Sequence, residues 1–147
     1  MNSLATRTRA DLSYFASVIA SSSTRFTGWS FQLWNKVLRY LQATAKDGLM
    51  YRLGGGESEL TCWSDAGYGG EGTRAQSGVL IAWGGGTTVW RSIRQRASAL
   101  STCEAEVAAP ALALQVVEGL RCLLTEWCVN IASPSAPHRP EFGLERV

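Results

Sequence analysis

Hydrophobic residues recur at helical spacing in the first third of the chain. Behind Asp11, apolar side chains follow one another at intervals of one, three and four residues, which predicts an amphipathic helix. A second helix is predicted from about Ser30 to Thr44, where the Asp47-Gly48 pair ends the pattern. The next five residues, Leu49–Leu53, predict a short strand.

From Leu60 onwards the pattern changes to that of extended structure. Strands are predicted at Leu60–Asp65, Gly78–Trp83 and Thr87–Gln95, with a turn at the three glycines 84–86. The last two strands are joined by so short a turn that they must be antiparallel neighbours. The three strands together predict an antiparallel meander.

A long helix is predicted after the strands, from near Thr102 to about Val129. Ser101, followed three residues later by Glu104, has the pattern of a capping box. Pro110 falls inside this helix and predicts a kink or a restart, at a cost of about 3 kcal/mol if nothing compensates. The residues expected to be buried are Ala108, Leu112, Val116, Leu120, Leu123, Leu124 and Trp127.

These elements predict a mixed α/β (α+β) fold, with the meander packed on the long helix and preceded by a two-helix segment. The 147 residues provide for one core or one small domain with an appendage, and are too few for a complete polymerase, kinase or two-domain dehydrogenase. The expected boundaries are a helical segment 1–53, a linker 54–59, a domain 60–129 and an irregular, proline-rich tail 130–147. No apolar run approaches the ~20 residues that span a bilayer, so no membrane span is expected.

Charge is distributed unevenly along the chain. Residues 1–53 hold seven basic residues against two acids, whereas residues 54–147 hold seven against ten. Between Gly72 and Cys103 the only charged residues are Arg74, Arg91, Arg94 and Arg96. A phosphate-contacting surface and a solvated basic strand explain this stretch equally well.

The four cysteines show no paired spacing typical of zinc sites or disulfide frameworks. Positions 62, 103, 122 and 128 contain no CxxC pair, and the sole histidine lies in the proline-rich tail. Reduced thiols are typical of proteins inside the cell, so an intracellular location, in the cytoplasm or the nucleus, is expected.

Two acids stand where a metal site is expected. Asp65 ends the first predicted strand and Glu106 lies in the first turns of the long helix. A β-β-β-α order can bring two such carboxylates together, and carboxylates are the ligands that Mg²⁺ prefers. A pair of Mg²⁺ ions in a carboxylate cage activates water and stabilises the leaving oxygen of a phosphodiester.

Several of these motifs, in register, resemble a known family. The segments LTCWSDAGYGG and SGVLIAWGGGTTVWRSIRQRASALSTCEAEVAA are similar to the ribonuclease H domain at the C-terminal end of copia-type LTR retrotransposon polyproteins. The upstream segment from RADLSYF to VLRYLQATAKDGL resembles the stretch that joins reverse transcriptase to ribonuclease H in those polyproteins. The resemblance covers about residues 7–129.

The resemblance implies an enzyme that cleaves the RNA strand of RNA–DNA hybrids with Mg²⁺. Asp65 matches the family's first catalytic acid and Glu106 the second, while Arg74, Arg91, Arg94 and Arg96 would contact the nucleic acid. Another interpretation of Glu106 stays open, because its position also fits an acidic residue on the solvent-exposed surface of the helix. Glu104 also matches a glutamate of the family, although the capping box accounts for it.

Departures from the family pattern weaken the expectation of activity. The family's third catalytic carboxylate lies on a strand after the long helix, and a further acid follows, whereas here the segment after Val129 contains no Asp. Glu141 and Glu145 lie in the proline-rich tail, which positions them poorly. Gly67 stands where members often carry a second Asp. Little or no nuclease activity is therefore expected of this chain.

A missing strand also implies an unpaired edge on the first strand of the meander, Leu60–Asp65. Exposed edges recruit another strand or aggregate, so a protein partner that covers this edge is expected. The alternative function is a non-catalytic structural or interaction subunit domesticated from a retrotransposon.

Overall fold

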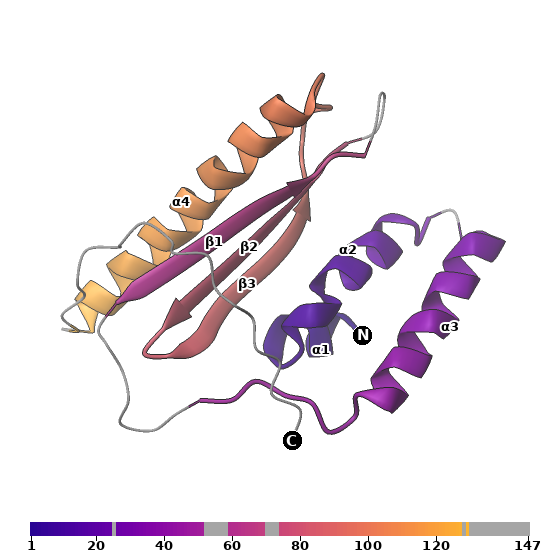
Figure 1. Ribbon diagram of the computed structural model, residues 1–147, viewed down its shortest axis with the longest axis horizontal. Coiled ribbons are helices and arrows are strands. Elements are labelled where there is room, and N and C mark those ends of the chain that lie inside the picture. Colours follow the sequence, from indigo (N-terminus) through magenta and orange to yellow (C-terminus); the bar gives the residue numbers. More distant parts are fainter. Residues whose placement is uncertain (25, 52–58, 70–73, 128, 130–147) are drawn as a thin grey trace. The chain divides into compact units, whose positions relative to one another are not determined.

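The computed structural model describes residues 1–24, 26–51, 59–69, 74–127 and 129 (Figure 1). The chain divides into two compact units, an N-terminal unit within Met1–Leu49 and a C-terminal unit within Met50–Leu144. Each unit is treated by itself. The tail expected at 130–147 and all but the last residue of the linker expected at 54–59 lie outside the described residues.

Helices alone form the N-terminal unit. They are α1 (Asn2–Arg7), a 3₁₀ turn (Ala10–Leu12), α2 (Ser13–Ser21) and α3 (Gly28–Ala43). The helix predicted behind Asp11 is present as α2, α1 was not predicted, and α3 begins two residues earlier than expected, behind the Thr27 cap. Its core is small, with Ala5, Leu12 and Val37 buried.

A buried arginine ties the start of this unit to the end of α3. The Arg9 guanidinium, in a residue only 8% exposed, donates to both carboxylate oxygens of Asp11, at 3.0 and 2.7 Å. It also donates to the Thr44 carbonyl and hydroxyl, at 2.9 and 2.6 Å. The Tyr40 hydroxyl donates to Asp11 at 2.7 Å, and the guanidinium lies over the Tyr40 ring. This network fixes the connection between α1 and α2, where Arg9 turns inward to reach the end of α3.

We expect Arg9→Lys to destabilise the N-terminal unit by about 1–3 kcal/mol, because an ammonium cannot reproduce the four directed bonds of the guanidinium fork. Hydrogen exchange of the amides in residues 1–49 measures this loss. Arg39→Lys, on the exposed side of α3, is the matched control and should change stability by less than about 0.5 kcal/mol. Equal effects of the two substitutions would contradict the role given to Arg9.

The same network makes the N-terminal unit sensitive to acid. Burial alone raises the pKa of the Asp11 carboxyl, but hydrogen bonds from Arg9 and Tyr40 and the charge of Arg9 together hold this pKa below its ordinary value. A lowered folded-state pKa contributes stability that is present above the ordinary pKa and is lost as the pH falls through the lowered one. We expect stability of this unit to fall below about pH 4, and Asp11→Asn to flatten that dependence in the same exchange measurement.

The C-terminal unit contains a three-stranded antiparallel sheet, in the order β1 (Leu60–Gly67), β2 (Gln76–Trp83) and β3 (Gly86–Arg94). This confirms the predicted meander and the mixed α+β class. Leu60 pairs with Trp83 and Asp65 with Gly78. Among the described residues β1 pairs only with β2, so its outer edge is open there.

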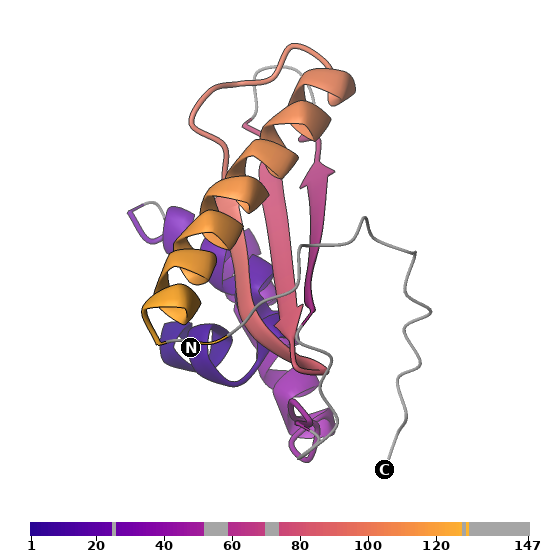
Figure 2. The same cartoon turned by 90° about the vertical axis from the view of Figure 1, so that its left-hand side faces the viewer.

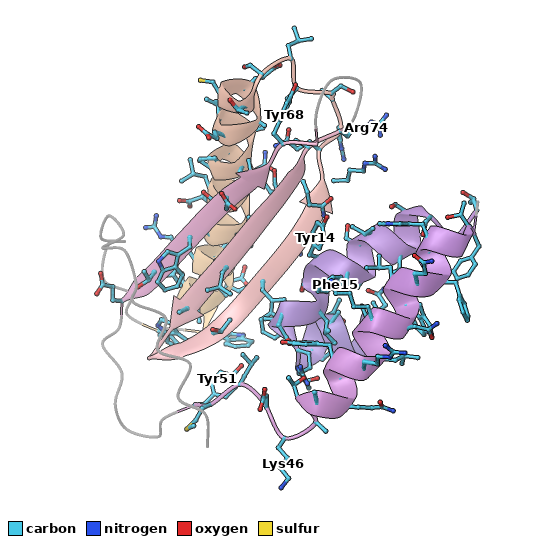
Figure 3. The ribbon with its side chains drawn as sticks, turned by 45° about the vertical axis from the view of Figure 1, so that its right-hand side comes forward. Tyr14, Phe15, Lys46, Tyr51, Tyr68 and Arg74 are labelled. Carbon is cyan, nitrogen blue, oxygen red and sulfur yellow. The ribbon has the colours of Figure 1, made fainter. Side chains whose placement is uncertain are left out.

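The turn between β2 and β3 has two residues, Gly84 and Gly85, both at positive φ. Such a turn matches the twist of a hairpin and needs residues without a Cβ. Gly86 is required for another reason: a Cβ there would collide with the ring of Tyr51, whose hydroxyl donates to the Thr87 carbonyl at 2.7 Å (Figure 3). Residues 49–51 form no strand, contrary to expectation, and residues 52 and 53 lie outside the described part.

The long helix α4 (Thr102–Glu126) covers one face of the sheet (Figure 2) and packs on β1 and β2. Its buried residues are Ala105, Ala109, Ala113, Val117 and Leu124. The expected buried stripe is therefore only partly right: Leu124 is buried and Leu112, Val116 and Leu120 are partly buried, but Ala108, Leu123 and Trp127 are exposed. The reason is that a row of alanines lets the helix lie closer to the sheet than leucines would.

The predicted restart at Pro110 does not occur, since α4 is continuous through it. Pro110 lies on an exposed position, where water can bond the Glu106 carbonyl that lacks a helical donor. By length and composition alone α4 could cross a membrane, and the expectation of no membrane span stays a prediction. A core helix passes the same test, and α4 packs on a sheet.

Candidate functional site

Asp65 lies near the end of β1 and is exposed. In β2, the alternate residues Ser77, Val79 and Ile81 are buried beneath α4. Asp65 pairs with Gly78, which belongs to the other set, so its carboxylate belongs to the sheet face opposite α4.

Glu106 lies in the second turn of α4 and is also exposed. At about 100° per residue it shares a stripe with Ala113, Val117 and Leu124, all of which are buried against the sheet. Its side chain is therefore on the flank of α4 turned towards the sheet, whereas the Asp65 carboxylate belongs to the opposite sheet face.

The start of α4 is fixed by Gln95, a residue to which the sequence alone gave no role. Its side-chain amide donates to the Ser77 hydroxyl at 2.9 Å and to the Ala105 carbonyl at 3.0 Å. Its backbone N–H donates to the Ala75 carbonyl at 2.8 Å. These bonds hold the turn that carries Glu106 at a fixed height over β2. The feature of the sequence that could have pointed to Gln95 was its position directly after the third strand.

Glu104 is a capping residue, as the spacing predicts. The Ser101 hydroxyl accepts from the Glu104 N–H at 3.2 Å, and the Glu104 carboxylate accepts from the Leu100 N–H at 2.7 Å. The Glu104 carboxylate therefore bonds the N–H of Leu100, the residue before the N-cap, and not the N–H of the N-cap Ser101 itself. Glu104 thus has a structural task and lies on the β3 flank of α4, away from Glu106.

The acids do not form a complete metal centre. In the described residues no three of His, Cys, Asp and Glu come close enough to hold an ion, and neither Asp65 nor Glu106 makes an ion pair there. Asp65 and Glu106 offer hard oxygen ligands of the right kind, but two exposed carboxylates on different elements bind Mg²⁺ weakly. The segment that would supply a further acid lies outside the described residues.

Three of the four arginines surround one hollow. Arg91, Arg94 and Arg96 line a space of about 590 Å³ between β3 and the first half of α4. Arg74 does not line it and lies instead at the end of the sheet where β1 finishes (Figure 3). All four side chains are exposed, and none of them makes an ion pair with a described residue.

Comparison with known proteins places the chain among sequences of transposon origin. It is 32% identical over 103 residues to the Retrovirus-related Pol polyprotein from transposon TNT 1-94 of Nicotiana tabacum, a match that covers 67% of this chain and 8% of that polyprotein. It is 37% identical over 110 residues to Secreted RxLR effector protein 161 of Plasmopara viticola, covering 74% of this chain and 77% of that protein. No protein-family model matches, and no solved structure gives a significant match.

These matches show that the chain is a mixed α+β protein of retrotransposon Pol origin. It belongs to the same family as Secreted RxLR effector protein 161.

We expect Mg²⁺ to bind the chain with a dissociation constant on the order of millimolar or weaker, because only two carboxylates are available and both are exposed. Titration followed by NMR of the Asp65 and Glu106 amides measures this affinity. Asp47→Asn, at an exposed acid in the N-terminal unit, is the control for non-specific ion binding. A micromolar site abolished by Asp65→Asn but retained in Asp47→Asn would contradict the expectation.

Proposed function

We propose that the chain is a fragment of a ribonuclease H-like domain derived from a retrotransposon, and that it has little or no nuclease activity. A complete domain of this kind would cleave the RNA strand of an RNA–DNA hybrid with Mg²⁺. The single observation that carries the proposal is the placement of the two matched acids. Asp65 lies near the end of β1 on the sheet face opposite α4, and Glu106 lies exposed in the second turn of α4, with no third acid beside them in the described residues.

The order of elements supports the fold assignment. Three antiparallel strands followed by a helix across β1 and β2 match the first half of a ribonuclease H-like domain, and the Pol polyprotein match supplies the origin. In a complete domain Arg74, Arg91, Arg94 and Arg96 would contact the phosphate backbone. Their exposure, without ion pairs among the described residues, leaves them free for such contacts.

The lack of activity follows from charge and geometry. Two-metal hydrolysis needs a cage of carboxylates to hold both ions against the substrate. Asp65 and Glu106 supply two, and no third acid joins them in the described residues. Metal affinity and rate should both fall in consequence.

The second candidate function is that of a non-catalytic interaction protein. The observation in its favour is the match to a protein named as a secreted effector over 77% of that protein's length. The open edge of β1 and the exposed apolar side chains of α4 provide surfaces for a partner.

The test is a hybrid-cleavage assay in Mg²⁺ and in Mn²⁺, with the unmodified chain beside Asp65→Asn. We expect the two to release indistinguishable, near-background amounts of product, because the site lacks a third ligand. Robust cleavage that disappears in Asp65→Asn would overturn the proposal.

Binding of the same hybrid separates the two candidate functions. A ribonuclease H-like fragment that keeps its substrate surface binds the hybrid with an affinity that falls as salt rises. A folded chain that shows neither cleavage nor salt-dependent binding favours the interaction protein.

A further inference from the structure

A groove runs along the side of α4 that faces β3. Two adjoining hollows, of about 590 and 370 Å³, share Arg91, Leu112 and Gln115 and so form one continuous depression. It exists because α4 lies over β1 and β2 and leaves the flank at β3 uncovered by described residues. The groove belongs entirely to the C-terminal unit.

One wall of the groove is a helical stripe of α4. The residues that line it recur at four-residue intervals from Ala108 to Leu123, which spans about 22 Å at 1.5 Å per residue. Towards the end of α4 this wall is apolar, with Val116, Leu120 and Leu123, and Val89 of β3 completes it. Leu123 is 52% exposed, a large apolar side chain that no described residue covers.

The opposite end of the groove is positively charged. Arg91, Arg94 and Arg96 line it, and the acid among the lining residues, Glu104, already accepts a hydrogen bond from the Leu100 N–H. The N-terminus of α4 adds its own partial positive charge at this end. The end over the arginines therefore favours an anionic group, while the other end favours an apolar one.

Gly119 leaves room on the groove wall. A Cβ at this position would meet no described atom within 4 Å, although glycine in the middle of a helix costs about 1 kcal/mol relative to alanine. No packing inside the described chain requires a glycine here. A second backbone that approached α4 closely would use this space.

We propose that this groove binds an amphipathic helix of a partner protein, of about four turns, with an apolar stripe and a cluster of acidic residues at the end that lies over Arg91, Arg94 and Arg96. The charge of one end and the apolar wall of the other match such a helix in length and in polarity. Nucleic acid fits less well, because no aromatic side chain lines the groove for a base to stack on. The inference rests on the second candidate function, and its failure would leave the first untouched.

Peptides are selected for binding to the full chain from a display library of about 16-residue sequences in which every position is random among helix-forming residues, apolar, acidic and basic. Peptides that also bind the Gly119→Leu chain are removed. The enriched peptides are expected to carry acids at one end and an apolar stripe. Gly119→Leu is suited to this because it fills the groove, meets no described atom at its Cβ and improves the helix.

Affinities of the enriched peptides are then measured by fluorescence anisotropy. Arg91→Glu should weaken binding by about tenfold or more, because it replaces attraction by repulsion of the acidic end. Arg39→Glu, an exposed charge reversal on α3, is the matched control and should change affinity by less than about threefold.

Three outcomes would overturn the proposal. The first is no enrichment over the Gly119→Leu chain. The second is enrichment of peptides that are basic or lack an apolar stripe. The third is displacement of the peptides by an RNA–DNA hybrid that itself binds the Gly119→Leu chain but not the Arg91→Glu chain. That result would mean that the arginines bind nucleic acid.

Discussion

Close packing of the alanine row of α4 on the sheet is the constraint on which the rest of the C-terminal unit depends. Ala105, Ala109 and Ala113 are at most 5% exposed, and side chains without a γ-carbon allow the helix to lie against β1 and β2. The bonds from Gln95 to Ser77 and Ala105 fix where this contact begins along the helix. Any larger side chain in the alanine row would lift the helix from the sheet.

Two features of function follow from this contact. It turns Glu106 towards the sheet and leaves its side chain exposed. It also turns Leu112, Val116 and Leu120 towards β3, where they are partly buried and line the groove. This groove is the surface to which we assign a partner helix.

The order of helices and strands was predictable from the sequence, but which face of the long helix packs on the sheet was not. Alternating and helical periodicities gave the three strands, the meander and the helix with its Ser101 cap. The buried stripe of α4 was placed too far towards Leu123 and Trp127, because hydrophobicity alone ranks leucine above alanine, whereas close packing against a sheet prefers alanine. The inward turn of Arg9 was not predicted because its partner Thr44 lies 35 residues away. Asp65 and Glu106 were chosen from the order of elements and from the family resemblance, and the fold puts them on two different elements, with Asp65 on the sheet face opposite α4.

The most direct measurement compares the free energies of unfolding of Ala109→Leu and Ala108→Leu by chemical denaturation. The two alanines are neighbours, one on the sheet face of α4 and one on the exposed flank. The account predicts that Ala109→Leu costs about 1–3 kcal/mol through overpacking, while Ala108→Leu costs close to nothing. A larger loss for Ala108→Leu would mean that the leucine stripe, and not the alanine row, lies on the sheet, and the groove would not exist.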